Sequence, residues 1–78
     1  MRHLIERRYM NLKLRGRRVE KGLSQLQLSK LLNISLSSYC QKEKGKVDFS
    51  LTEIQDLLYY LDCEFDDIFF KIFKGDFG

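Results

Sequence analysis

Apolar residues recur at helical spacing along almost the whole chain, and this spacing, in a chain without proline, favours an all-helical fold. The pattern predicts a first helix over residues 12–21 that ends at Gly22. A second helix is expected to follow an N-cap at Ser24 and to end at Asn33, a residue type that accepts the left-handed conformation. The apolar residues of this second helix are Leu28, Leu31 and Leu32.

Two further serines mark the starts of the next helices. Ser35 can cap a third helix over Leu36–Lys44 after a turn of only three residues, and Gly45 is the natural place for that helix to stop. The run Ser50–Glu53 is typical of a capping box before an apolar ladder, and it predicts a fourth helix. The ladder consists of Ile54, Leu57, Leu58 and Leu61.

The acidic pair Asp66–Asp67 would favour the start of a fifth helix by interacting with its dipole. The apolar side of that helix would be formed by Ile68, Phe69, Ile72 and Phe73. A chain of 78 residues has room for one compact domain. The sequence therefore predicts an all-α fold of five helices in a single core.

Charge is distributed very unevenly between the two parts of the chain. Residues 1–46 hold twelve Lys and Arg against three Asp and Glu, a net charge of about +9, whereas residues 47–78 hold two against eight, about −6. Such asymmetry suits a protein that presents one face to a polyanion while the other end packs or associates. Simple solvation of a small basic surface is the alternative.

The cysteines and the hydropathy argue against a metal site and a membrane span. Cys40 and Cys63 have no CxxC spacing, and His3, the one histidine, is not near either of them in sequence. We expect two reduced thiols, no metal, and a place in the cytoplasm, where free thiols persist. No apolar run approaches the length of a membrane helix.

The segment Gln25–Lys44 has the features that a helix-turn-helix needs. Ser29 is small where two helices must cross closely, Asn33 lies at the turn, and Ile34 and Tyr39 can bury apolar surface between the helices. The flanking runs are Gly22-Leu23-Ser24-Gln25 and Glu43-Lys44-Gly45-Lys46. Together these features resemble the Cro/C1 repressor family, also called XRE-like regulators, over roughly residues 11–70. The resemblance implies a compact five-helix, lambda-repressor-like domain.

The resemblance also implies that the third helix lies in the major groove of double-stranded DNA. Gln41 is the best candidate for base readout, because a glutamine amide can bond bidentately to adenine. Serine hydroxyls can bond to base edges and a leucine can touch a thymine methyl. The further readout candidates are Leu36, Ser37 and Ser38.

Other residues are expected to hold the DNA backbone or to steady the recognition unit. Gln25 resembles the family's glutamine at the start of the second helix, which holds a phosphate oxygen together with the helix N-terminus. Further candidates for phosphate contacts, for which ordinary surface solvation is the alternative, are Arg15, Lys42, Lys44 and Lys46. Arg18 and Glu43 match family positions that form a structural ion pair. Arg17 departs from the family, which often has an apolar residue there.

The ends of the chain leave alternatives open. We expect the domain to occupy residues 11–74, with residues 1–10 as an N-terminal extension or basic arm and residues 75–78 as a C-terminal tail. Aromatic residues near the C-terminal end exceed what one short helix buries, so some would face a partner in a homodimer. The candidate interface residues are Phe69, Phe70, Ile72 and Phe73. The alternative is that they close the core of the monomer.

No convergent catalytic set is present in the sequence: there is no Cys/His pair close in sequence, no phosphate-binding glycine loop and no HExxH motif. We expect a non-enzyme that needs no cofactor and has no evident small-molecule ligand. The predicted function is a sequence-specific double-stranded DNA-binding transcription regulator, a repressor of phage or mobile-element type. The alternative is a protein-interaction module on the same fold, such as an antitoxin, anti-repressor or adaptor.

Overall fold

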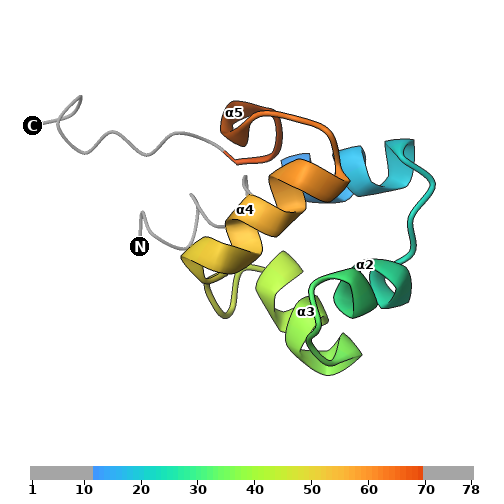
Figure 1. Ribbon diagram of the computed structural model, residues 1–78. Helices are drawn as coiled ribbons and strands as arrows, with labels where there is room; N and C mark the ends of the chain where they lie inside the picture. Colours follow the sequence, from blue (N-terminus) through green and yellow to red (C-terminus); the bar gives the residue numbers. More distant parts are fainter. Residues whose placement is uncertain (1–11, 70–78) are drawn as a thin grey trace, which may run out of the picture.

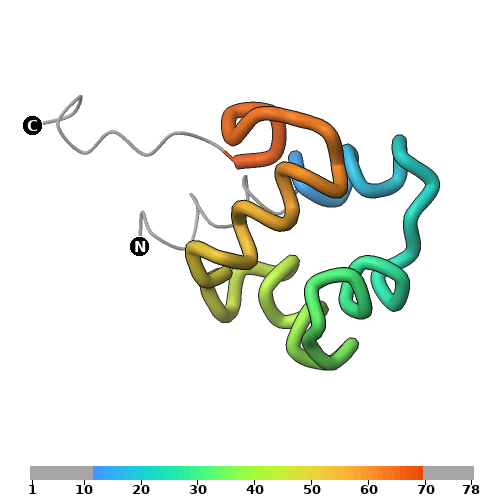
Figure 2. Tube along the Cα trace, in the orientation of Figure 1, coloured from blue at the N-terminus to red at the C-terminus, as the bar shows by residue number. Residues whose placement is uncertain are grey.

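The computed structural model describes residues 12–69, and over this range the chain is helical with no strand. This confirms the predicted all-α class. The first helix is described over residues 12–20. Four helices follow it, namely α2 Gln25–Leu31, α3 Leu36–Glu43, α4 Leu51–Tyr60 and α5 Phe65–Ile68. In Figures 1 and 2, α2 and α3 lie together at one end of the molecule, with α4 between them and α5.

The helix boundaries follow the capping residues that the sequence offers. The hydroxyls of Ser24, Ser35 and Ser50 each accept a hydrogen bond from the backbone N–H three residues later, at 3.0 to 3.1 Å. Gly22 ends the first helix with φ +74°, and Gly45 follows α3 with φ +82°. Asn33 has φ 61° between α2 and α3, as predicted for a left-handed residue. These local signals account for the starts of α2, α3 and α4 and for the ends of the first helix, α2 and α3.

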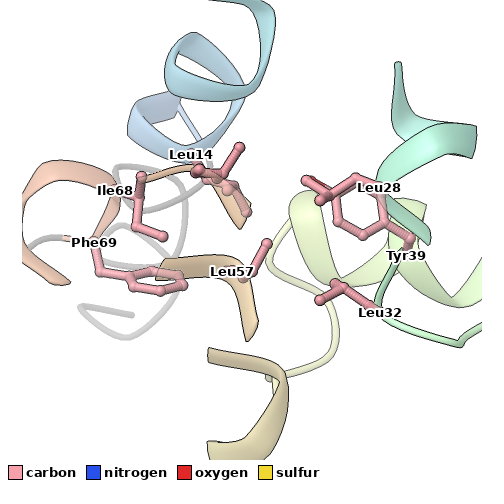
Figure 3. Close-up of a cluster of buried hydrophobic side chains, with 8 residues drawn as sticks. Leu14, Leu28, Leu32, Tyr39, Leu57, Ile68 and Phe69 are labelled. Carbon is pink, nitrogen blue, oxygen red and sulfur yellow. The ribbon is translucent and has the colours of Figure 1, made fainter. Parts of the chain in front are cut away.

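The core joins the two ends of the molecule through α4. Figure 3 shows Leu57 of α4 between two groups of buried side chains. One group holds Leu14, Ile68 and Phe69, and the other holds Leu28, Leu32 and Tyr39. Leu31 does not join them, because it is 39% exposed, whereas Leu28 and Leu32 face the core. The apolar side of α2 is therefore narrower than its leucine content suggests.

The last helix is shorter than the sequence pattern implies. α5 spans four residues, and its start is stabilised by the carboxylate of Asp67, which accepts a hydrogen bond from the backbone N–H of Glu64 at 2.8 Å. Phe69 then turns to an extended conformation, is only 2% exposed and packs against Phe49. The prediction that Phe69 lies at a dimer interface is thus corrected, because its ring is used within the monomer core. The other candidates, Phe70, Ile72 and Phe73, lie outside the described residues.

Two cations of the first helix, one turn apart, bind carbonyl groups at the ends of α4 and α5. Arg17 donates to the carbonyl oxygens of Leu61 at 3.1 Å and Asp62 at 2.7 Å. Lys13 donates to the carbonyl oxygens of Asp66 and Phe69. Helix C-termini leave carbonyl groups without intrahelical partners, and cations favour that end of the dipole. Arg17 therefore has a structural role at the position where the resemblance leads us to expect an apolar residue.

Candidate nucleic-acid interface

The helix-turn-helix unit consists of α2, a four-residue connection and α3, which lie against each other in Figure 1. Ser29 of α2 is 1% exposed, and its hydroxyl donates to the carbonyl oxygen of Leu26 at 2.7 Å. The small side chain is therefore buried with its polar atom satisfied. The backbone N–H of Ile34 in the turn bonds to the Ser29 carbonyl at 3.0 Å and ties the turn to α2.

Tyr39 and Glu43, four residues apart, form the inner face of α3. Glu43 is only 4% exposed, yet its carboxylate accepts four hydrogen bonds. Oε2 accepts from Arg18 Nε at 2.8 Å and from the Tyr39 hydroxyl at 2.7 Å. Oε1 accepts from Gln25 Nε2 at 2.7 Å and from Arg18 Nη2 at 3.3 Å. One buried carboxylate thus connects the first helix, α2 and α3.

The expected ion pair between Arg18 and Glu43 is a nearly enclosed, bidentate contact, with side chains 9% and 5% exposed. Burial alone raises the pKa of Glu43, but hydrogen bonds from Arg18, Tyr39 and Gln25 and the charge of Arg18 hold that pKa below its ordinary value. Burial, reinforced by the hydrogen bond to Glu43, raises the pKa of Tyr39. At neutral pH the carboxylate is charged and the phenol is neutral.

Lys42 takes part in a second ion pair, on the side of α3 that faces α4. Its ammonium lies 2.6 and 2.8 Å from the two carboxylate oxygens of Glu53, and the side chains are 12% and 14% exposed. Glu53 also accepts from the backbone N–H of Ser50 at 2.9 Å within the predicted capping box. Because its charge is paired and largely covered, Lys42 is set apart from the exposed cations that are expected to contact phosphate.

The outer face of α3 carries Ser37, Gln41 and Lys44, which follow one another at spacings of four and three residues. All three are exposed, in contrast to the buried positions 39 and 43. The Gln41 amide makes no hydrogen bond with any residue of the range 12–69. Leu36 is 42% exposed at the start of the helix, whereas Ser38 is half-buried on the side toward Lys42. α3 therefore presents a polar, solvent-facing stripe opposite its anchored side.

An open pocket lies beside this stripe, between the first helix, the start of α2 and the end of α3. Its lining residues are Leu12, Arg15, Arg18, Ser24, Gln25, Glu43 and Lys44. The structure thus brings together Gln25, Arg15 and Lys44, three of the predicted phosphate contacts, around the buried ion pair. Lys46 is exposed after α3 and does not line the pocket.

A family model described as helix-turn-helix matches residues 14–68, which is more than half of the chain and covers α2 to α5 and most of the first helix. The chain belongs to the Cro/C1-type helix-turn-helix family. This is a family of DNA-binding transcription regulators, which are generally not enzymes. Searches of curated proteins and of solved structures gave no match to the chain.

The helix-turn-helix domain also contains contacts that sequence reasoning missed. The Gln25 amide is bonded to Glu43 and to Cys40, and Lys42 is paired with Glu53. These partners are eleven to eighteen residues apart, so no helical period relates them. The glutamate of the Ser50–Glu53 capping box was the one available signal, because it had to lie near the N-terminus of α4.

Residues 12–69 of this helix-turn-helix domain contain neither a helix that could span a membrane nor a cluster of metal-binding side chains. Within residues 12–69 no helix is long and apolar enough to cross a membrane. Over the same range, no three His, Cys, Asp or Glu side chains group in a way that could hold a metal ion. Cys40 and Cys63 are both free thiols, and burial raises the pKa of Cys63.

Proposed function

We propose that this protein is a sequence-specific regulator that places α3 in the major groove of double-stranded DNA. The single observation that carries the proposal is the division of α3 into two faces. Its inner side is fixed by one buried and one part-buried ion pair, whereas Ser37, Gln41 and Lys44 point to solvent on the outer side. A recognition helix needs this combination, because base contacts demand a fixed backbone and unoccupied polar side chains.

Within this proposal Gln41 reads a base, with adenine as the favoured partner of its amide. Ser37 lies one turn earlier on the same face, and Leu36 offers an apolar contact for a thymine methyl. Ser38 is half-buried at the edge of the stripe, and we assign it a lesser part in base readout. Gln41 is the centre of the proposed readout.

Backbone contacts are proposed for the cations beside the stripe. Arg15 and Lys44 line the pocket next to Gln25, and Lys46 follows in the connection to α4. Phosphate contacts from such side chains hold the register of the protein on DNA and make affinity fall as salt rises. Lys42 has no part in this set.

We further propose a homodimeric repressor of phage or mobile-element type that acts in the cytoplasm, with residues 11–74 as the domain. The family resemblance supports the repressor class, and a two-fold dimer would match a near-palindromic operator with half-sites about one DNA turn apart. Occupancy of an operator by such a domain would exclude other proteins from the same DNA. Residues 1–10 would be a basic arm and residues 75–78 a tail.

The test is selection from a randomised duplex pool at two salt concentrations, with sequencing of the retained DNA. We expect the wild type to enrich a short near-palindrome and Gln41→Ala to lose or broaden it. The matched control is Gln55→Ala, which removes an exposed glutamine of α4 and should retain the wild-type selection. If the wild type retains no sequence preference, specific regulation is contradicted, and a protein-interaction module on this fold becomes the better account.

A further inference from the structure

Gln25 makes both of the side-chain hydrogen bonds that join α2 to α3 within the described residues. Its Nε2 donates to Glu43 Oε1 at 2.7 Å, and its Oε1 accepts from the Cys40 thiol at 3.3 Å. Gln25 is the first residue of α2, while Cys40 and Glu43 lie one turn apart in α3. The amide therefore connects two successive turns of the recognition helix to the preceding helix.

The orientation of this amide is determined by its partners. An ionised carboxylate can only accept hydrogen bonds, so the nitrogen of Gln25 must face Glu43. Its oxygen then faces Cys40, whose thiol is a hydrogen-bond donor. With both ends engaged, the Gln25 side chain is held against α3, and Gln41 follows Cys40 directly in the chain.

We infer that Gln25 is a positioning residue for base readout, which sets the rotation of α3 on α2 and thereby the direction of Gln41. This inference rests on the proposed function and goes beyond a phosphate contact for Gln25. Two contacts on one side of α3, three residues apart, resist rotation of the helix about its own axis. A base contact is lost by small displacements, because hydrogen bonds weaken steeply away from their preferred geometry.

The test compares Gln25→Met with the wild type on duplexes that differ only at the base pair read by Gln41. Methionine keeps the length of the side chain and removes both hydrogen bonds to α3. We expect the affinity ratio between the preferred base and the next best to fall about threefold to tenfold, as for the loss of one hydrogen bond. Gln55→Met, at an exposed position of α4, should keep the wild-type ratio.

A second variant, Cys40→Ala, keeps the inference testable if Gln25→Met fails to fold. It removes the donor to Gln25 while leaving the amide itself in place, so a backbone contact by Gln25 would be retained. We expect a smaller fall in the same affinity ratio, and we expect Cys40→Ser, which keeps a donor, to restore it. Thermal unfolding of each variant establishes that it is folded under the binding conditions.

The outcomes separate this inference from the proposed function. If Gln25→Met binds all duplexes more weakly by one common factor and keeps the wild-type base preference, the inference is overturned and Gln25 contacts the DNA backbone alone. A wild-type preference in Cys40→Ala would overturn the part assigned to the thiol. If the wild type itself shows no base preference, the proposed function fails, and the positioning role fails with it.

Discussion

The inner and outer faces of α3 use polar side chains in opposite ways. On the inner face Glu43 is 4% exposed and accepts four hydrogen bonds from three elements, whereas Gln41, two residues earlier, is exposed and bonds to none of the described residues through its side chain. Within one eight-residue helix, the inner-face residues therefore stabilise the fold, while the outer-face residues are available for binding. Substitutions on the inner face should change folding first, and substitutions on the outer face should change only what the protein binds.

The largest change in the free energy of unfolding is expected for a substitution of Glu43. Glu43→Ala removes the carboxylate and leaves Arg18 charged and buried, so the free energy of unfolding should fall by about 3–5 kcal/mol. Urea denaturation followed by circular dichroism measures this change. A matched comparison is Glu20→Ala, because Glu20 is exposed and pairs with Arg17 at the surface, where a loss of less than about 1 kcal/mol is expected. A loss as small at Glu43 would contradict its anchoring role.

Lys42 and Lys44 sharpen the comparison, since two lysines of the same segment should behave differently. Lys42→Met should lower the free energy of unfolding by about 1–3 kcal/mol, because it leaves Glu53 largely covered without its partner. It should leave the salt dependence of DNA binding unchanged. Lys44→Met should have little effect on stability and should reduce the slope of log affinity against log salt by about one. The reverse assignment of these two effects would overturn the proposed placement of phosphate contacts.

Gln41→Ala should change base discrimination without changing the stability of the fold. We expect the free energy of unfolding to stay within about 0.5 kcal/mol of the wild type, because the side chain is exposed. Discrimination at one base pair of a selected duplex should fall by about 1–3 kcal/mol. Parallel denaturation and binding titrations measure the two quantities on the same sample. A variant that loses stability and discrimination together would show that the faces are not separable.

The smallest effect is a pH dependence that belongs to the inner face. The folded state holds the pKa of Glu43 below its ordinary value of 4.5, so the stabilising contribution is present above that value and is lost as pH falls through the folded pKa. Glu53, whose pKa is also lowered, acts in the same direction. Urea denaturation from pH 7 to pH 3 should show a shallower acid-side loss in Glu43→Gln than in the wild type. Equal slopes would argue against the lowered pKa.

The sequence was sufficient for the local features of the fold, because capping and left-handed residues act on their own neighbours. The three serine caps, Asn33, Gly22 and Gly45 all lie where such residues are expected to start or end helices. The apolar spacing overestimates the length of α5, because it continues past Ile68 while the chain at Phe69 is extended and its ring fills the core. Tertiary packing overrode helical periodicity there.

For the candidate site, the sequence was sufficient to identify α3 as the proposed recognition helix. It was less able to separate the residues of this segment that face solvent from those that bind other side chains. The exposure of Ser37 and Gln41 agrees with their predicted part in base readout, whereas Lys42, which the sequence alone does not distinguish from the exposed lysines, is part-buried against Glu53. A lysine side chain, like the Gln25 amide, can be solvated or can bind another side chain, and only the three-dimensional arrangement decides between these. The resemblance to Cro/C1 regulators pointed to Arg18 and Glu43, but the enclosure of that pair required the structure.

The most direct measurement is an NMR titration of the labelled protein with a duplex selected from the random pool, with attention to side-chain amide signals. The account predicts that the Gln41 amide and the backbone signals of Ser37 and Lys44 shift or broaden most. The amide of Gln55 on α4 serves as an internal reference and should change little. Changes confined to α4 and α5, with the Gln41 amide unaffected, would contradict the claim that the outer face of α3 reads DNA.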